Sequence, residues 1–199
     1  MNRRALLSTT SAAALSLTAL AGCTGTVRRE LSGDVEMDVA TIAFHPASEP
    51  WFVDGLSASS SSSPHTELFA DAPSDVSALF TDGYSPDEHS LDDLLGEADD
   101  SSTFFVLYEA RMSRSNAYQV APTILYGDLG WTGWRTVTAP MARAPRDPSE
   151  LDLPPDTEEV IATTLVRYSA DVSPRTVRLP VYDEETGTLL AERTVRLGS

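Results

Sequence analysis

The second half of the chain is a succession of short segments rich in β-branched and aromatic residues, and this feature constrains the fold most. Such residues favour extended strands, and the Gly, Pro, Asp or Asn residues between the segments favour turns. The expected strands span residues 103–112, 118–126, 131–138, 160–168, 176–182 and 189–197. Short strands at this spacing are typical of two packed sheets. The sequence therefore predicts an all-β fold, an immunoglobulin-like antiparallel β-sandwich.

Other patterns extend this sandwich. Residues 35–44 alternate between apolar and polar side chains and predict a half-buried first strand. Trp51-Phe52-Val53 predicts a short strand or a plug of the core. The acidic turn at Thr186-Gly187 predicts a C-terminal hairpin over residues 176–197, and the prolines of residues 144–156 predict a loop that crosses between the sheets.

The segment at about residues 55–102 is expected to be an irregular Ser/Asp-rich insertion, solvated and carrying one or two short helices. Ser85-Pro86-Asp87-Glu88 has the spacing of a capping box with proline at the first helical position. Three leucines then form a short apolar stripe, which predicts a helix over residues 86–95 ended by Gly96. A weaker helical turn is expected over residues 75–80.

The first 22 residues have the three parts of a secretory signal: a positive start, a short apolar run and small residues before a cleavage point. Arg3 and Arg4 supply the charge, and the apolar run at residues 12–21 is too short for a helix that spans a bilayer. Cys23, the only cysteine, follows directly. A small buried hydrophobic residue or a free thiol is the alternative interpretation of this cysteine.

The ending Leu20-Ala21-Gly22-Cys23 resembles the lipobox of prokaryotic lipoprotein signal peptides. The resemblance implies that residues 1–22 are a signal peptide, that Cys23 carries the lipid and that residues 23–33 are a tether. Residues 34–199 would then form a single β-sandwich domain, anchored at the extracytoplasmic face of the cell membrane, which would be its partner. The start Arg3-Arg4-Ala5-Leu6-Leu7 is also similar to a twin-arginine export signal.

The charge of the chain limits its partners. All 14 basic residues are arginine, and without Arg3 and Arg4 the remaining 12 face 30 carboxylates, a net charge of −18. Self-repulsion of this size destabilises a compact state unless salt screens it. The composition resembles that of exported proteins of extremely halophilic archaea; an acidic protein from a GC-rich genome is the alternative. Because the arginines are dispersed along the sequence, no nucleic-acid partner is expected.

A weaker resemblance covers residues 104–197. The strand Phe105-Val106-Leu107, the turn Trp131-Thr132-Gly133-Trp134 and the final hairpin are similar to features of small uncharacterised haloarchaeal lipoproteins. This resemblance carries no catalytic or binding residues over to the present chain.

The residues that could carry chemistry form no recognisable motif. The three histidines, His45, His65 and His89, are far apart in sequence and expected in loops or at a helix start, so we predict no metal site and no cofactor. No nucleophile elbow and no phosphate-binding loop is present in the sequence, so we predict no enzyme.

The aromatic residues Tyr126, Trp131 and Trp134 are the candidate ligand platform. Trp131 and Trp134 are an odd number of residues apart, so in a regular strand one would face the core and the other would face outward. The leading hypothesis is a lipid-anchored extracytoplasmic domain with a non-enzymatic interaction or envelope role in high salt. The alternative is a lipoprotein that binds a small ligand or carbohydrate through the Trp131 and Trp134 region.

Overall fold

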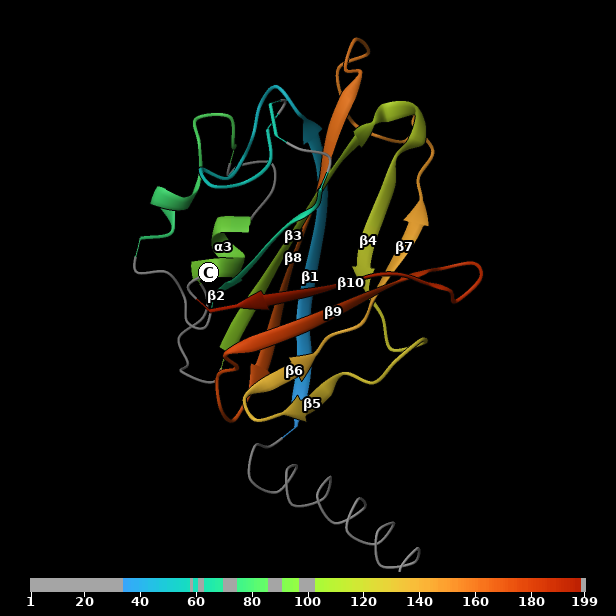
Figure 1. Ribbon diagram of the computed structural model, residues 1–199. Helices are drawn as coiled ribbons and strands as arrows, with labels where there is room; N and C mark the ends of the chain where they lie inside the picture. The colour runs from blue at the N-terminus through green and yellow to red at the C-terminus, as the bar shows by residue number, and fades with distance from the viewer. Residues whose placement is uncertain are drawn as a thin grey trace, which may run out of the picture.

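Strands β3 (Thr103–Ser113) and β8 (Glu159–Ala170) pair along their lengths at the centre of a four-stranded antiparallel sheet. β1 (Val35–Pro46) pairs with β8 and β2 (His65–Phe69) with β3, so the strand order is β1-β8-β3-β2 (Figure 1). The structure is a computed structural model and describes residues 34–57, 59–60, 63–69, 75–85, 91–96 and 103–197.

The second sheet is organised around β9, which forms a hairpin with β10 on one edge. The other edge of β9 pairs in parallel first with β6 and then with β7. β5 pairs with β6, and β4 pairs with β7. The strands of this sheet are β4 (Tyr118–Pro122), β5 (Gly130–Gly133), β6 (Thr136–Thr138), β7 (Met141–Pro145), β9 (Thr176–Asp183) and β10 (Leu189–Arg196).

β6 and β7 behave as one strand that is interrupted at Pro140. Thr136 pairs with Thr176 and Met141 with Val181, so the register on β9 is the same on both sides of the break. Proline has no N–H to donate to a ladder, which explains the interruption. The all-β sandwich is confirmed, but these parallel pairs make the second sheet mixed, whereas the sequence predicts an antiparallel, immunoglobulin-like arrangement.

The core between the sheets is built from large apolar side chains. Phe104 and Tyr168, from neighbouring central strands, stack with their ring centroids 5.1 Å apart and are fully buried. Met141 and Val181 of the second sheet belong to the same cluster. Burial of these side chains is the main favourable contribution to the stability of the sandwich.

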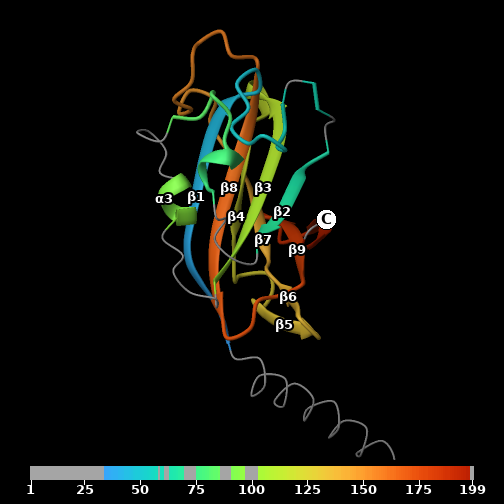
Figure 2. The ribbon, with the colours of Figure 1, turned by 90° about the vertical axis from the view of Figure 1, so that its left-hand side faces the viewer.

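The outer face of the four-stranded sheet is buried as well. Successive residues of a strand point to opposite faces, so Phe104 faces the second sheet and Phe105 faces outward. The helix α3 (Leu91–Gly96) buries Leu91 and the rest of its leucine stripe against Phe105, together with Trp51. Figures 1 and 2 show α3 on the opposite side of the sheet from β9. The plug predicted at Trp51 is confirmed, and the segment expected to be a solvated excursion contributes a third packed layer.

Several element boundaries differ from the sequence predictions. β2 lies in the segment predicted to be irregular, and β7 includes the first two residues of the loop expected at residues 144–156. The expected strand over residues 131–138 is the β5–β6 hairpin, and that over residues 118–126 ends at Pro122. The two 3-10 turns are η1 (Ser77–Leu79), within the predicted turn, and η2 (Arg114–Asn116). Of the helix expected over residues 86–95, residues 86–90 lie outside the described part.

Candidate functional site

Trp134 stands at the tip of the β5–β6 hairpin and is 87% exposed. Gly133 pairs with Thr136, so Trp134 and Arg135 form the two-residue turn. Arg135 has a φ of 52°, a left-handed conformation that costs an L-residue about 1–3 kcal/mol. Its guanidinium donates hydrogen bonds of 2.9 and 3.1 Å to the Ser173 carbonyl, which hold the turn in place. The hairpin therefore presents Trp134 to solvent on a fixed support.

Trp131 and Tyr126 do not join Trp134 in one site. Trp131 packs against the core between the sheets, and among the described residues its Nε1 is buried without a hydrogen-bond partner. The Tyr126 ring lies 5.8 Å from the Tyr182 ring, and its hydroxyl donates to the Glu184 carbonyl. One core and one outward tryptophan agree with the prediction, although a turn rather than strand alternation separates them.

The hairpin tip belongs to the end of the molecule at which β1 begins (Figures 1 and 2). Val35, the first residue of β1, pairs with Ala170, the last residue of β8. From Ala170 the chain continues through residues 171–175 into β9. The Arg175 N–H donates to the Arg135 carbonyl at 2.9 Å, which joins this connection to the hairpin. Any tether that precedes Asp34 therefore reaches the fold at the same end as Trp134.

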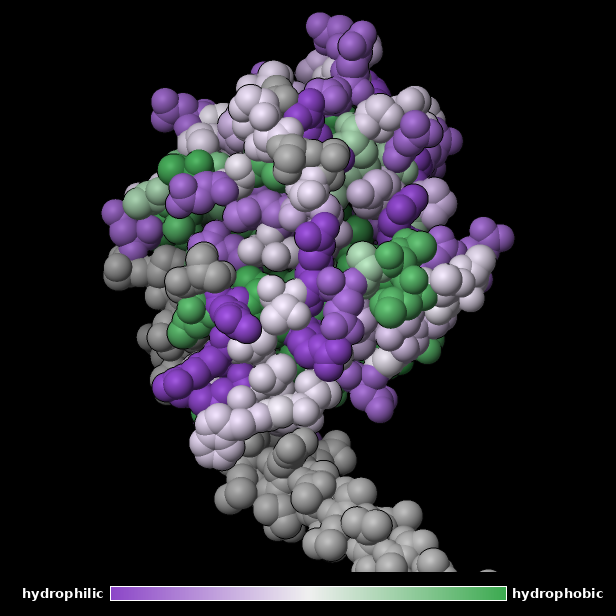
Figure 3. Space-filling model, in the orientation of Figure 1, coloured by the Kyte–Doolittle hydropathy of each residue, from purple (hydrophilic) through white to green (hydrophobic). Residues whose placement is uncertain are grey.

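Three arginines lie on segments that backbone pairing joins to this hairpin. Arg175 is exposed beside Arg135, and Arg196 is exposed on β10 opposite Thr176. The Leu197 N–H donates to the Arg175 carbonyl at 3.0 Å. Figure 3 shows a strongly hydrophilic surface at the lower left, where β9 begins and β10 ends. The arginines are dispersed in the sequence, but the fold places the segments that carry Arg135, Arg175 and Arg196 next to one another.

Two exposed apolar residues in the loop from β4 to β5 are not predicted from the sequence. Ile124 and Leu125 are each 77% exposed in the loop from β4 to β5. The expected strand over residues 118–126 hides them, because in a strand one of the two would face the core. The strand ends at Pro122 instead. The position of this apolar pair between Pro122 and Gly127 was the sequence signal that could have indicated an exposed loop.

A second cluster of polar side chains lies buried on the outer face of the four-stranded sheet. Glu109 is fully buried and accepts hydrogen bonds from Thr163 Oγ1 at 3.1 Å and from the Leu56 N–H at 2.8 Å. His45 Nε2 lies 3.2 Å from Thr163 Oγ1, and its Nδ1 lies 3.0 Å from the Glu49 carbonyl. Burial raises the pKa of Glu109 above its ordinary value. Both His45 and His65 lie in strands, not in the loops that the sequence predicts.

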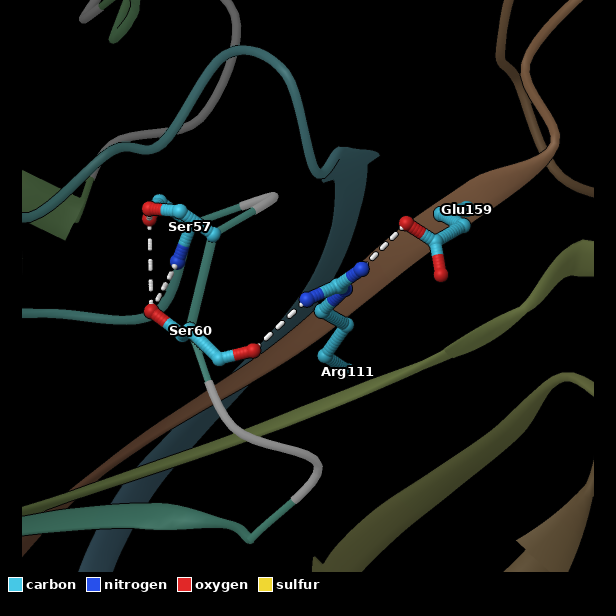
Figure 4. A network of polar contacts seen from close by, with 5 residues as sticks. Ser57, Ser60, Arg111 and Glu159 are labelled. Atoms are coloured by element: carbon cyan, nitrogen blue, oxygen red, sulfur yellow. Dashed lines mark hydrogen bonds and ion pairs between the residues drawn. The ribbon is translucent and has the colours of Figure 1, made fainter.

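This buried cluster fastens the loop after β1 to the sheet, and Arg111 adds a second attachment (Figure 4). The Arg111 guanidinium donates to the Ser60 carbonyl at 2.7 Å and forms an ion pair with Glu159. The Ser57 N–H in turn donates to Ser60 Oγ at 2.8 Å. Thr163 is buried between Glu109 and His45 and forms hydrogen bonds with both. We therefore interpret the cluster of these three residues as structural.

Gly55 is expected to be intolerant of substitution because its backbone passes close to Glu109. An added Cβ would overlap Glu109 Oε2 and lie 2.9 Å from Phe52 Cβ. We expect Gly55→Ala to lower the free energy of unfolding by about 1–3 kcal/mol. Gly96→Ala is the control, since its Cβ would meet nothing within 4 Å. Chemical denaturation measures both variants, and equal stabilities would contradict the packing described.

The residues proposed for export and anchoring lie outside the described part of the chain: Arg3, Arg4, Leu20, Ala21, Gly22 and Cys23. His89 also lies outside it. Among the described residues, no helix has the length and apolar character needed to cross a membrane. Comparison of the chain with family models, curated proteins and solved structures finds no match.

Proposed function

We propose that this protein is a lipid-anchored extracytoplasmic domain with a non-enzymatic interaction role, and that its Trp134 end lies against the membrane. The observation that supports the proposal is the exposed Trp134 beside three arginines, at the end where β1 begins. The lipid on Cys23 and the export of the chain are part of the proposal.

Tether length favours this orientation. Residues 23–33 extend to at most roughly 36–40 Å, at about 3.3–3.6 Å per residue. A lipid on Cys23 would therefore hold the β1 end of the domain near the bilayer. Tryptophan favours the interface between headgroups and hydrocarbon, and arginine forms paired hydrogen bonds with phosphate. The side chains at this end of the domain thus match the chemistry of a lipid surface.

Fluorescence quenching by brominated lipids tests the proposal. In the lipidated protein on anionic vesicles that contain brominated phospholipid, we expect the emission of Trp134 to be quenched by at least about half. Trp51 is buried and Trp131 packs against the core, so they should contribute little to the quenched fraction.

Two variants separate the parts of this proposal. Trp134→Phe should remove most of the quenching while leaving the protein on the vesicles. Cys23→Ser should release the protein into solution if the lipid is the main anchor. Equal quenching in the wild type and in Trp134→Phe would show that another face of the domain meets the membrane.

A further inference from the structure

Strand β10 lies at an edge of the second sheet. Its register on β9 runs from Ala191, opposite Val181, to Arg196, opposite Thr176. Among the described residues, no strand pairs with the other edge of β10. Such an edge presents a row of backbone N–H and C=O groups, to which an extended peptide can add as a further strand.

The hydrogen bonds of β9 show which residues of β10 face the unpaired edge. The Ala139 N–H donates to the Arg178 carbonyl at 2.9 Å, so the backbone groups of Arg178 point away from β10. In an antiparallel ladder, the residue opposite such a position also points its N–H and C=O away from its partner. Thr194 is opposite Arg178, so its backbone groups face the unpaired edge. Because alternate residues are equivalent, the same holds for Glu192 and Arg196.

The face of β10 that carries these three side chains is exposed and basic. Glu192, Thr194 and Arg196 are all exposed. Glu192, the only carboxylate of β10, accepts two hydrogen bonds of 2.8 Å from Arg178 of β9, which offset its charge. The exposed face of this edge therefore carries a positive charge in a chain whose net charge is −16.

Arginines flank the edge on the core-facing side as well. Arg193 of β10 is half-buried, and the guanidinium carbon of Arg143 lies 4.3 Å from the centroid of the Tyr118 ring. Burial raises the pKa of Tyr108 to about 12, and the nearby charges of Arg193 and Arg143 oppose this rise. A strand added to β10 would thus meet guanidinium groups with the side chains of both its faces.

We propose that the unpaired edge of β10 binds an acidic, extended segment of a partner protein, which adds to the second sheet as a further strand. Backbone hydrogen bonds to Glu192, Thr194 and Arg196 provide the affinity, and carboxylates opposite the arginines provide the specificity. A second copy of this chain is a poorer partner, because two such edges would bring together more arginines than carboxylates. The site does not include Trp134 and is independent of the membrane contact proposed above.

Two synthetic peptides test the proposal on the full chain in about 1 M salt. The acidic probe is Thr-Glu-Glu-Val-Glu-Glu-Thr with blocked ends, and in the basic probe lysine replaces each glutamate. At this ionic strength, repulsion between the acidic peptide and the acidic chain is screened beyond about 3 Å, whereas direct ion pairs persist. We expect nitrogen–proton correlation NMR to give a Kd below about 1 mM for the acidic probe, with the largest shifts at residues 192–196. The basic probe should bind at least about fivefold more weakly.

A proline tests the backbone pairing. Thr194→Pro removes the N–H that faces the unpaired edge, and the ladder with β9 does not use this N–H, so the variant should fold. We expect the Kd of the acidic probe to rise at least about tenfold. Thr194→Val is the matched control, because it keeps the N–H and should leave the Kd unchanged. Thermal unfolding checks that both variants fold.

A neutralised arginine tests the charge complementarity. Arg193→Gln should raise the Kd of the acidic probe about two- to fivefold, the upper range of an exposed ion pair. Arg146→Gln is the matched control, since it removes an exposed arginine from the connection between β7 and β8 and changes the net charge equally. This control should leave the Kd unchanged.

Each outcome decides a part of the proposal. Failure of the acidic probe to bind at millimolar concentration, or equal affinity of the two probes, would overturn it. Equal Kd values for Thr194→Pro and Thr194→Val would overturn strand addition, and equal values for the two arginine variants would overturn the role of charge. Sedimentation of the chain as a dimer that Thr194→Pro dissociates would show that a second copy occupies the edge instead. Trp134→Phe should leave the Kd unchanged, which distinguishes this site from the proposed membrane contact.

Discussion

Replacement of Glu109 by alanine is expected to lower the free energy of unfolding by about 2–4 kcal/mol at pH 5. The variant leaves the buried Leu56 N–H without its acceptor, and an unsatisfied buried donor costs about 1–3 kcal/mol. It also removes the acceptor of Thr163 Oγ1 and opens a cavity between the sheet and the loop after β1. Chemical denaturation with matched slopes measures the change.

Glu109→Gln is the informative control because it keeps the shape and an acceptor oxygen. We expect it to differ from the wild type by less than about 1 kcal/mol at pH 5. If Glu109→Ala and Glu109→Gln lower the free energy of unfolding by the same amount, the hydrogen bonds to Leu56 and Thr163 contribute little to stability.

The raised pKa of Glu109 makes the stability of the wild type, but not that of Glu109→Gln, depend on pH through this residue. The ordinary pKa of a glutamic acid side chain, 4.5, applies to the unfolded chain, and burial raises the pKa of Glu109 in the folded state above this value. The folded state therefore binds the proton more tightly, and the stabilisation that this provides is full below about pH 4.5. It is lost as the pH rises through the folded pKa. Glu109→Gln lacks this loss, so its stability relative to the wild type should increase as the pH rises from 4.5.

The strand pattern of the sequence predicts the central layers well because period-two alternation directly reflects burial. The expected strand over residues 103–112 contains Phe104 and Phe105, which the structure buries on opposite faces. An apolar residue on both faces indicates a strand covered on both sides. The sequence therefore contained a signal for the third layer, although the acidic residues around α3 favoured a solvated excursion.

Polar residues inside strands were harder to place from the sequence. Glu109 follows Phe105 and Leu107 at alternate positions, so the sequence puts a carboxylate on an apolar face. Only the fold shows what satisfies it, since Thr163 is 54 residues and Leu56 is 53 residues away. Hydrogen bonds across such separations have no local sequence signal.

The separate positions of the three platform residues could not be predicted from the sequence for a related reason. Alternation within a strand places side chains on two faces, but a two-residue turn replaces the strand at Trp134. Parallel pairing of β6 and β7 with β9 is a long-range contact that the sequence pattern does not reveal. Because the break at Pro140 interrupts this pairing, its effect on the second sheet was equally hidden.

Transfer of a protein that consists of residues 23–199 from molar salt to about 50 mM salt is expected to unfold it. The 12 arginines and 30 carboxylates that follow residue 22 give a net charge of −18, whose self-repulsion is screened over about 3 Å in 1 M salt and about 10 Å in 0.1 M. Circular dichroism during dialysis measures the transition. A domain that stays fully folded at 50 mM salt would favour the alternative, an acidic protein without adaptation to salt.

The connection from β7 to β8 offers a direct test that repulsion causes this unfolding. Residues 147–159 contain six carboxylates, of which Glu159 forms an ion pair with Arg111. Glu150 and Asp156 are exposed, so Glu150→Gln with Asp156→Asn removes two charges without disturbing the core. We expect this double variant to unfold at a lower salt concentration than the wild type. Arg175→Gln makes the net charge more negative, so the repulsion in the folded state increases. This variant should therefore unfold at a higher salt concentration than the wild type.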